Sequence, residues 1–255
     1  MSFYCPGMQT GRMWDGMLPR QAPLHAYSDY FDGIALDPKW AEWDVLGNTT
    51  VDGTVDGQVS VTQVTHGGAS FAGIYQTIPL PDSQFAVTAY YALQERMINT
   101  PDIGIFVGED MATLPNTGNF TYAGISTASV NGPRFTSQGF TSYNVGGAIF
   151  VGEAAYGAPL AGFFRVFVDI DWTALPNPTV SFTSLWSLTG HRWCQMNTNT
   201  GTIAAYMPDW AGSGNASIGI CLNNGGTGLD ATAVSKMFRY DATADMHFPV
   251  GNSIR

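Results

Sequence analysis

The sequence predicts an all-β protein in which two antiparallel sheets pack together behind an irregular N-terminal arm. Only 12% of the positions are charged, and 30 glycines and 14 prolines stand among many Thr, Ser, Val, Phe and Tyr residues. This composition is typical of short strands joined by frequent turns. Strand-like runs follow one another along the chain without a convincing amphipathic helix. At 255 residues the chain is long enough to bury the core of one large sandwich.

The first 28 residues differ from the rest of the chain. They contain three prolines and four methionines, have no period of 2 or 3.6, and are slightly basic in a protein whose net charge is −10. We therefore divide the chain into an arm, residues 1–28, and a sandwich, residues 29–255. The arm either packs on its own sandwich or docks on a neighbouring subunit. In the second case the residues that would bind the partner are Phe3, Tyr4, Met8, Arg12, Met13, Trp14, Met17 and Arg20.

Ten segments of the sandwich have the length and residue types of strands. They are residues 57–64, 71–78, 84–93, 102–109, 119–126, 163–171, 179–188, 191–197, 217–223 and 235–241. Turn signals such as Asp52-Gly53 and Asn223-Asn224-Gly225 separate them. Residues 131–161 are rich in Gly, Ser and Tyr, and they fit either a long hairpin or a surface loop. No repeat of 20 to 50 residues occurs, which argues against a propeller or a solenoid.

Charge and cysteine content limit the partners and the compartment. Ten basic residues against twenty acidic ones would repel a phosphate backbone, so we expect no nucleic-acid partner. The N-terminal residues lack the basic and apolar regions of a signal peptide, and no apolar run is long enough for membrane insertion. Cys5, Cys194 and Cys221 match no zinc spacing. We expect free thiols in a reducing compartment, and leave a pair between Cys194 and Cys221 open.

Two segments carry a resemblance to a known family. Residues 29–40 follow the pattern D-x-F-(D/N)-G-x-x-L-(D/N)-P-x-W, which resembles the first strand of concanavalin A-like lectin and glucanase domains, the laminin-G-like jelly roll. The resemblance implies that Phe31 and Leu36 face the core and that Trp40 begins the next strand.

The second segment, residues 162–193, resembles a late hairpin of the same family. Its Ser-x-x-Gly-x-x-Trp unit is Ser187, Gly190 and Trp193. The similarity spans about residues 29–242 and implies a two-sheet antiparallel jelly roll. It is specific for the fold and does not determine an activity.

The glycosidases of this family place carboxylates at E-x-D-x-x-E on one strand, because a retaining mechanism needs two carboxyl groups about 5 to 5.5 Å apart. The nearest match here is Asp169, Asp171 and Ala174, in which one acid is shortened and the last is missing. Period-2 geometry puts both aspartates on one face with Arg165. We expect a polar strand face without catalytic residues, and therefore no enzyme.

The family resemblance also implies candidate binding residues. Some relatives hold a structural Ca²⁺ between the opening loop and the last strand, for which Asp32 and Asp241 are the candidate ligands; no other cofactor is expected. Trp186, Trp193 and Trp210 are candidates for stacking on a sugar. Trp40 and Trp43 should face opposite ways, because they lie three residues apart in a strand.

Three functions follow from these observations. A lectin-like jelly roll with an arm, without a secretion signal or catalytic motif, resembles a bacteriophage virion component such as a capsid decoration protein, a head fibre or a tail accessory subunit. Such a subunit would be made in the host cytoplasm, form a homo-oligomer or bind other capsid or tail proteins, and reach host glycans from the virion surface. The alternatives are a stand-alone carbohydrate-binding module and a glycoside hydrolase.

Overall fold

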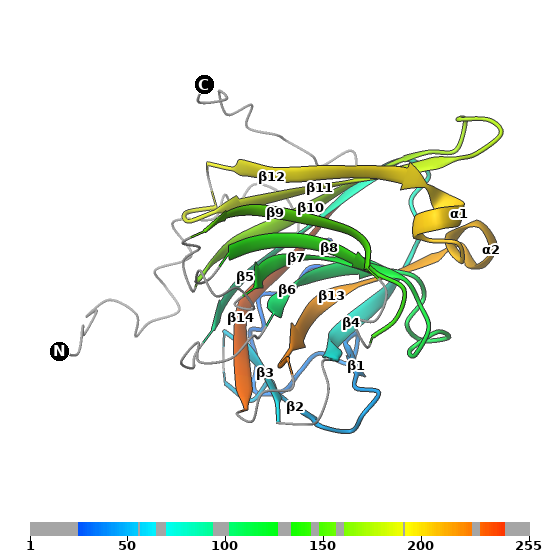
Figure 1. Cartoon of the computed structure of the whole chain (residues 1–255). Helices are drawn as coiled ribbons and strands as arrows, with labels where there is room; N and C mark the ends of the chain where they lie inside the picture. Colours follow the sequence, from blue (N-terminus) through cyan, green and yellow to red (C-terminus); the bar gives the residue numbers. More distant parts are fainter. Residues whose placement is uncertain are drawn as a thin grey trace.

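A computed structural model describes residues 25–55, 57–64, 70–93, 102–126, 134–143, 148–156, 161–190, 192–225 and 230–242. It confirms an all-β sandwich of two seven-stranded antiparallel sheets (Figure 1). The arm residues Phe3 to Arg20 named above, and Cys5, lie outside the described residues. Within those residues, no helix has the length and apolar character needed to cross a membrane.

The two sheets are named here by their strand order. Sheet 1 consists of β1 (Ala41–Trp43), β4 (Phe71–Pro79), β13 (Asn215–Asn223), β6 (Asp102–Gly108), β7 (Phe120–Ser126), β8 (Arg134–Phe140) and β9 (Ala148–Tyr156). Sheet 2 consists of β12 (Cys194–Thr202), β11 (Thr179–Ser187), β10 (Ala161–Asp171), β5 (Gln84–Leu93), β14 (Ala231–Ala242), β3 (Val59–Gln63) and β2 (Thr49–Asp52). Two short helices, α1 (Ile203–Tyr206) and α2 (Trp210–Ser213), follow β12.

All ten predicted strands are present, and residues 131–161 contain the β8–β9 hairpin. The strand expected from Asp29 was wrong. Asp29 makes a single bridge to Phe238, and its Oδ1 then accepts a 2.6 Å hydrogen bond from the backbone N–H of Phe31. Phe31 has a φ of 55°, in the left-handed region, so the chain turns away from the sheet. Phe31 is nevertheless buried in the main core and the partly buried Leu36 packs against that core, as the resemblance implied. Trp40, also buried, directly precedes β1.

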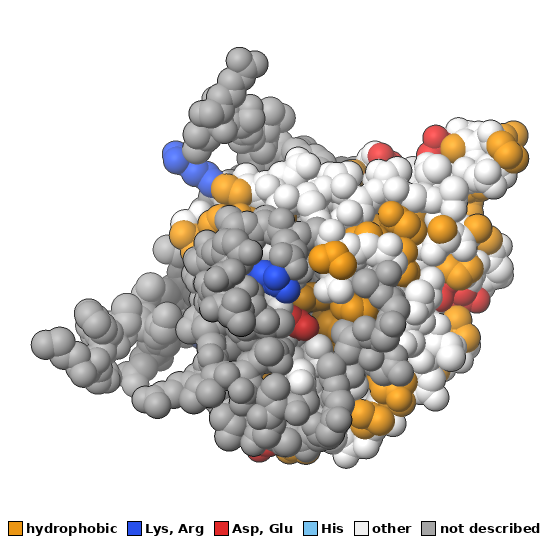
Figure 2. Space-filling model, in the orientation of Figure 1, with side chains coloured by type: hydrophobic (Ala, Val, Ile, Leu, Met, Phe, Trp, Pro, Cys, Tyr) orange, Lys and Arg blue, Asp and Glu red, His pale blue; other side chains and the backbone are white. Residues whose placement is uncertain are grey.

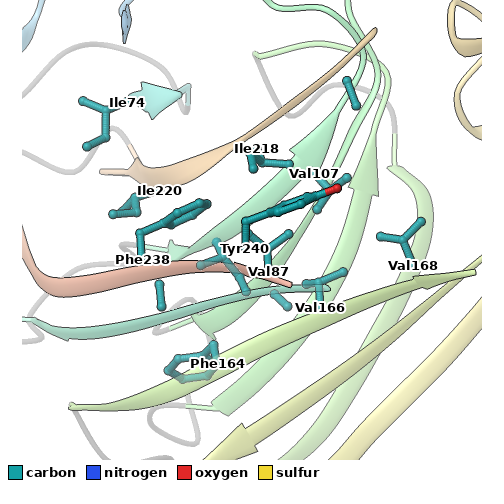
Figure 3. Close-up of a cluster of buried hydrophobic side chains, with 14 of the residues drawn as sticks. Ile74, Val87, Val107, Phe164, Val166, Val168, Ile218, Ile220, Phe238 and Tyr240 are labelled. Atoms are coloured by element: carbon teal, nitrogen blue, oxygen red, sulfur yellow. The ribbon is translucent and has the colours of Figure 1, made fainter. Parts of the chain in front are cut away.

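The main core fills the space between the sheets. Alternate residues of the sheet 2 strands face it, as the pattern of β11 shows, where every second residue from Val180 to Ser184 is buried. Side chains from both sheets interdigitate there (Figure 3). The labelled members are Ile74, Val87, Val107, Phe164, Val166, Val168, Ile218, Ile220, Phe238 and Tyr240.

Sheet 1 also buries its other face, called here its outer face. A second cluster of buried side chains covers that face: Trp43, Phe71, Tyr75, Phe106, Met111, Phe120, Tyr122, Phe140 and Cys221. The chain between β6 and β7 contributes Met111 to it, and Trp43 Nε1 donates to the carbonyl of Pro115 in the same segment. Trp40 faces the main core while Trp43 faces this second core, as their spacing predicted.

Glycines on the outer face of sheet 1 make room for the aromatic rings. A Cβ on Gly104 would lie 2.9 Å from Cδ2 of Tyr122, and one on Gly219 would lie 2.8 Å from Cε1 of Phe106. The rings therefore rest directly on the backbone of the sheet. On the face shown in Figure 2, charged side chains are scattered and uncharged ones predominate among the described residues.

Substitution of Gly219 by alanine tests this packing. The new Cβ would lie 2.1 Å from the carbonyl oxygen of Ile74, which is backbone and cannot move aside cheaply. We expect Gly219→Ala to lower the free energy of unfolding by about 3 kcal/mol in urea denaturation. Gly212→Ala is the matched control, because its Cβ would meet nothing within 4 Å. Equal stability of the two variants would contradict this account.

Candidate functional site

A row of polar side chains crosses the outer face of sheet 1 beside the second core. The strand register places Asn223 opposite Asp102, Asp102 opposite Ser126, and Ser126 opposite Arg134. Asn223 Nδ2 donates a 3.0 Å hydrogen bond to Asp102 Oδ2. Ser126 and Tyr122 also hydrogen-bond to the Asp102 carboxylate. The result is a polar cluster, defined here as Asp102, Tyr122, Ser126, Arg134 and Asn223.

Burial governs the charge of this polar cluster. Asp102 is 9% exposed, and desolvation raises the pKa of its carboxyl group from 3.8 to about 6. Hydrogen bonds from Ser126, Asn223 and Tyr122 and the charge of Arg134 lower the pKa, but they offset only part of the desolvation. Burial, together with the charge of Asp102, also raises the pKa of the neighbouring Cys221 thiol well above its usual value. Asp102 therefore titrates close to neutral pH.

The strand ends beside the polar cluster are fixed by amide side chains. Asn224 donates its backbone N–H to Gln63 Oε1 at 2.6 Å, and its Nδ2 donates to the Gln63 carbonyl at 3.0 Å. The amide of Gln63 in turn donates to the carbonyl of Ser70. These buried contacts hold the end of β13, and therefore Asn223, against sheet 2 and the start of β4.

Two further buried acids lie where β6 ends, away from Asp102. Glu109 accepts hydrogen bonds from the backbone N–H groups of Asn119 and Asp209, and Asp110 accepts one from Asn215 Nδ2 at 3.4 Å. Burial raises the pKa of Glu109, while the two backbone hydrogen bonds lower it. These acids connect the segment between β6 and β7 to α2 and β13, so their hydrogen bonds have a structural role.

The candidate calcium ligands Asp32 and Asp241 differ in their surroundings. Asp241 is buried, and its two oxygens accept hydrogen bonds from Arg165 Nη2, at 3.1 Å, and from Arg239 Nε. A carboxylate already engaged by two guanidinium groups is not arranged as a calcium ligand. Asp32 is exposed. The described residues contain no group of three His, Cys, Asp or Glu side chains that could hold a metal ion.

The three tryptophans proposed for sugar stacking lie in three different places. Trp210 is 1% exposed and its indole N–H donates to the carbonyl of Gly108, so that prediction was wrong: the ring has no free face. Trp186 points toward the main core and stacks on Phe135 at 4.3 Å. Trp193 lies on the outer face of sheet 2, with the Arg165 guanidinium 6.0 Å from its ring centroid. They do not form a common platform.

Trp193 is held by the Ser-x-x-Gly-x-x-Trp unit seen in the sequence. Ser187 Oγ accepts hydrogen bonds from the N–H groups of Thr189 and Gly190. Gly190 has a φ of 75° and lies against the Phe163 ring. The turn after β11 thus folds back over sheet 2 and brings Trp193 next to a small cluster formed by Tyr90, Phe163 and Met237.

Asp169 and Asp171 share the outer face of sheet 2, as their spacing predicted, and both are exposed. Asp171 Oδ1 accepts hydrogen bonds from Thr173 and Ala174, which lower the pKa of this carboxyl group. Asp169 Oδ1 accepts a hydrogen bond from Gln84 at 3.1 Å. Asp171 therefore begins the turn into β11. The carboxylates of the opening segment act in the same way, since Asp37 accepts from the N–H of Lys39.

The two described cysteines are not paired. Cys194 is exposed on β12 of sheet 2, and Cys221 is buried on the outer face of sheet 1. The disulfide left open by the sequence is therefore not formed.

Residues of the polar cluster were missed by the sequence reasoning. Asp102, Ser126 and Asn223 stand at the ends of predicted strands, but their alignment depends on the register between β13, β6 and β7. The only local signal was an acid, Asp102, at the start of an otherwise apolar run.

Comparison of the sequence with protein-family models and with curated proteins found no match. The structure, in contrast, resembles solved sandwiches. An engineered GH43 glycoside hydrolase with endo-xylanase and exo-arabinofuranosidase activity matches 87% of this chain with a TM-score of 0.56 at 12% identity. The match covers 41% of that enzyme's chain, so the present chain spans less than half of its length.

Two other solved structures match over almost their whole length. The exoplasmic or lumenal domain of VIP36, in a form bound to Ca²⁺ and Man3GlcNAc, has a TM-score of 0.54 at 11% identity, over 89% of this chain and 93% of that domain. The Lotus tetragonolobus seed lectin has a TM-score of 0.50 at 10% identity, over 84% and 97% of the two chains. The chain has the concanavalin A-like fold. At these identities the likeness concerns the fold alone.

The raised pKa of Asp102 predicts how the stability of this concanavalin A-like sandwich depends on pH. Because the folded pKa is above the unfolded one, the stabilisation is fully present below pH 3.8 and is lost as the pH rises through about 6. The loss is on the order of 3 kcal/mol. In Asp102→Asn this part of the pH dependence should disappear, as measured by urea denaturation between pH 4 and pH 7. Identical pH profiles for the two proteins would rule out a raised pKa at Asp102.

Proposed function

We propose that the protein is a non-enzymatic carbohydrate-binding sandwich whose ligand site is the polar cluster on the outer face of sheet 1. The observation that carries the proposal is the position of Asp102 beside the second core, with Asn223, Ser126 and Tyr122 around it. Sugars present many hydroxyl groups that donate and accept hydrogen bonds. A carboxylate, an amide and hydroxyls gathered in one place offer matching partners.

The number of acids supports binding over hydrolysis. Glycoside hydrolysis generally requires two carboxyl groups on either side of the bond that is cleaved. Among the described side chains of the polar cluster, Asp102 is the one carboxylate. Asp169 and Asp171 belong to sheet 2, and Glu109 is engaged by two backbone N–H groups at the end of β6. The fold shared with the Lotus seed lectin and with glycan-bound VIP36 is consistent with a binding role.

A glycan array with the full-length protein tests this function. We expect binding to at least one glycan, and Asp102→Asn should weaken that binding at least tenfold, because the substitution replaces one of the two acceptor oxygens by an NH2 donor and removes the charge. Asp169→Asn is the matched control and should leave binding unchanged. Turnover of the bound glycan would instead favour a hydrolase. Retained binding in Asp102→Asn would exclude the polar cluster as the site.

A second proposal concerns residues 1–28, which we infer to anchor the sandwich in a larger particle such as a virion, as a capsid decoration protein, head fibre or tail accessory subunit. The supporting observation is where this segment joins the sandwich. Asp29 exchanges two 2.7 Å backbone hydrogen bonds with Phe238, and Ser28 Oγ accepts one from the N–H of Tyr240. Lys39 Nζ donates to the Ser28 carbonyl. Because these hydrogen bonds fix residues 28 and 29 to the sandwich, binding of the preceding residues to a particle would also hold the sandwich on that particle. The sandwich would then face solvent at the virion surface.

Deletion of residues 1–24 tests the anchoring role. The cut preserves Tyr27 and Ser28, which pack on and hydrogen-bond to Tyr240, so the sandwich should remain folded with an unchanged melting temperature. We expect the full-length chain to self-associate or to bind other virion subunits in light scattering, and the deletion variant to remain a monomer. Equal masses for the two proteins, with equal incorporation into particles, would refute anchoring by the arm.

A further inference from the structure

The β2–β3 hairpin, at one edge of sheet 2, exposes apolar side chains (Figure 1). Seven large apolar side chains are exposed in the part of the chain that the structure describes, and four of them lie between positions 34 and 64. These four are Ile34, Leu46, Val55 and Val64, called here the hairpin surface. Single exposed apolar residues are common on proteins, but their concentration in one region is typical of a protein contact site.

Ile34 and Val55 lie at the end of the hairpin formed by its turn. A Cβ on Gly53 would lie 2.8 Å from the backbone nitrogen of Leu36, so the turn after β2 packs directly on the segment before β1. Ile34 and Val55 are each two residues away from this contact. Their side chains therefore belong to the same end of the hairpin.

Leu46 and Val64 lie at the opposite end. The N–H of Val64 donates to the carbonyl of Asn48 at 2.9 Å, and Leu46 precedes Asn48 by two residues. Asp44 fixes the loop between β1 and β2, because its two carboxylate oxygens accept hydrogen bonds from the N–H groups of Asn48 and Thr49. The hairpin surface thus has two apolar ends connected by β2 and β3.

The same part of the chain is strongly acidic. Residues 29–64 contain seven acidic residues against one lysine, a net charge of −6 in a protein whose total is −10. Asp44 and Asp52 hydrogen-bond to neutral backbone N–H groups, which leave their negative charge in place. Glu42 is exposed on β1. The hairpin surface therefore combines apolar side chains with negative charge.

Residues 1–24 of the arm have the complementary composition. They contain four methionines and three aromatic residues, and two arginines against one aspartate give them a net charge of +1. On an acidic hairpin surface, burial of the apolar side chains would supply affinity, and the opposite charges would supply orientation. A stable interface uses about 20–30 residues on each side, which is the length of this segment.

The base of the arm lies next to the hairpin surface. Asp29 exchanges two 2.7 Å backbone hydrogen bonds with Phe238 on β14. Only two residues later, the carbonyl of Phe31 accepts a 2.9 Å hydrogen bond from Gly57, in the turn between β2 and β3. In a two-fold dimer each arm would leave beside its own hairpin surface and enter that of the partner, so both arms exchange together. Exchange of identical segments is a low-cost route to a closed dimer.

We propose that the hairpin surface binds residues 1–24 of a second copy of this chain, with the two arms exchanged in a symmetric dimer. This exchange rests on the anchoring role proposed above for the arm, and it identifies another copy of the chain as the arm's partner. Each copy uses its arm and its hairpin surface once, so assembly through this contact stops at the dimer.

Light scattering on full-length proteins tests the contact. We expect a dimer for the wild type, and a dissociation constant at least tenfold higher for the double variants Ile34→Ser/Val55→Ser and Arg12→Glu/Arg20→Glu. Leu175→Ser is the matched control, because this side chain is 85% exposed, as against 84% for Ile34, but lies in the turn between β10 and β11. It should dimerise like the wild type, and equal melting temperatures would show that the variants are folded.

Mixing the two double variants distinguishes arm exchange from an arm that folds back on its own chain. The Ile34→Ser/Val55→Ser protein keeps an intact arm, and the Arg12→Glu/Arg20→Glu protein keeps an intact hairpin surface. One of the two contacts can therefore form between them, and we expect a mixed dimer at concentrations where each variant alone is a monomer. Absence of the mixed dimer would overturn the exchange.

A monomeric wild type, or an Ile34→Ser/Val55→Ser variant that dimerises like the wild type, would also overturn the inference. Loss of the dimer in Arg12→Glu/Arg20→Glu alone would retain the arm as the anchor and place its partner surface elsewhere. Failure of the anchoring role gives a different result, because the Arg12→Glu/Arg20→Glu variant and the deletion of residues 1–24 would then both associate like the wild type.

Discussion

Sheet 1 packs against sheet 2 on one face and against the second core on the other, so the central strands of sheet 1 lose contact with water on both sides. Burial of each large apolar side chain contributes about 2 kcal/mol, and both faces gain in this way. Contact with a core on each face explains why β6 and β7 are buried at every position. It also requires Gly104 and Gly219, because aromatic rings can lie flat on the sheet only where no Cβ intervenes.

The same constraint creates the polar cluster. Tyr122 lies over Gly104, and from that position its hydroxyl reaches the Asp102 carboxylate. Asp102 therefore lies at the edge of the second core. It is desolvated like a core residue, but its neighbours are polar. Asn223 is aligned with it because Gln63 and Asn224 fix the end of β13. A site of this kind depends on the packing of the second core as much as on its own hydrogen bonds.

Much of the fold could be read from the sequence because strand formation here follows local patterns. The alternation in β11 and the strand-like runs of β4 to β7 identified strands directly. The spacing of three residues between Trp40 and Trp43 predicted that they face opposite ways, and they lie in different cores.

The site could not be read in this way. Asp102, Ser126 and Asn223 are brought together by cross-strand register, which no local pattern encodes. Trp210 was misread because a short helix turns its ring into the main core, where its N–H finds Gly108. The arginine partners of Asp241 could not be read from the sequence either, because they lie on its own strand and on β10, two strands away across β5.

The two sheets use their few charges differently. On sheet 1, Asp102 is accommodated by neutral donors and by a shift of its pKa, so the local charge can vary with pH. On sheet 2, the buried Asp241 is accommodated by hydrogen bonds from two guanidinium groups, those of Arg165 and Arg239. A carboxylate in the first environment suits hydrogen bonding to neutral hydroxyl groups. The two sheets thus accommodate a buried carboxylate in two chemically distinct ways, although only 12% of the residues are charged.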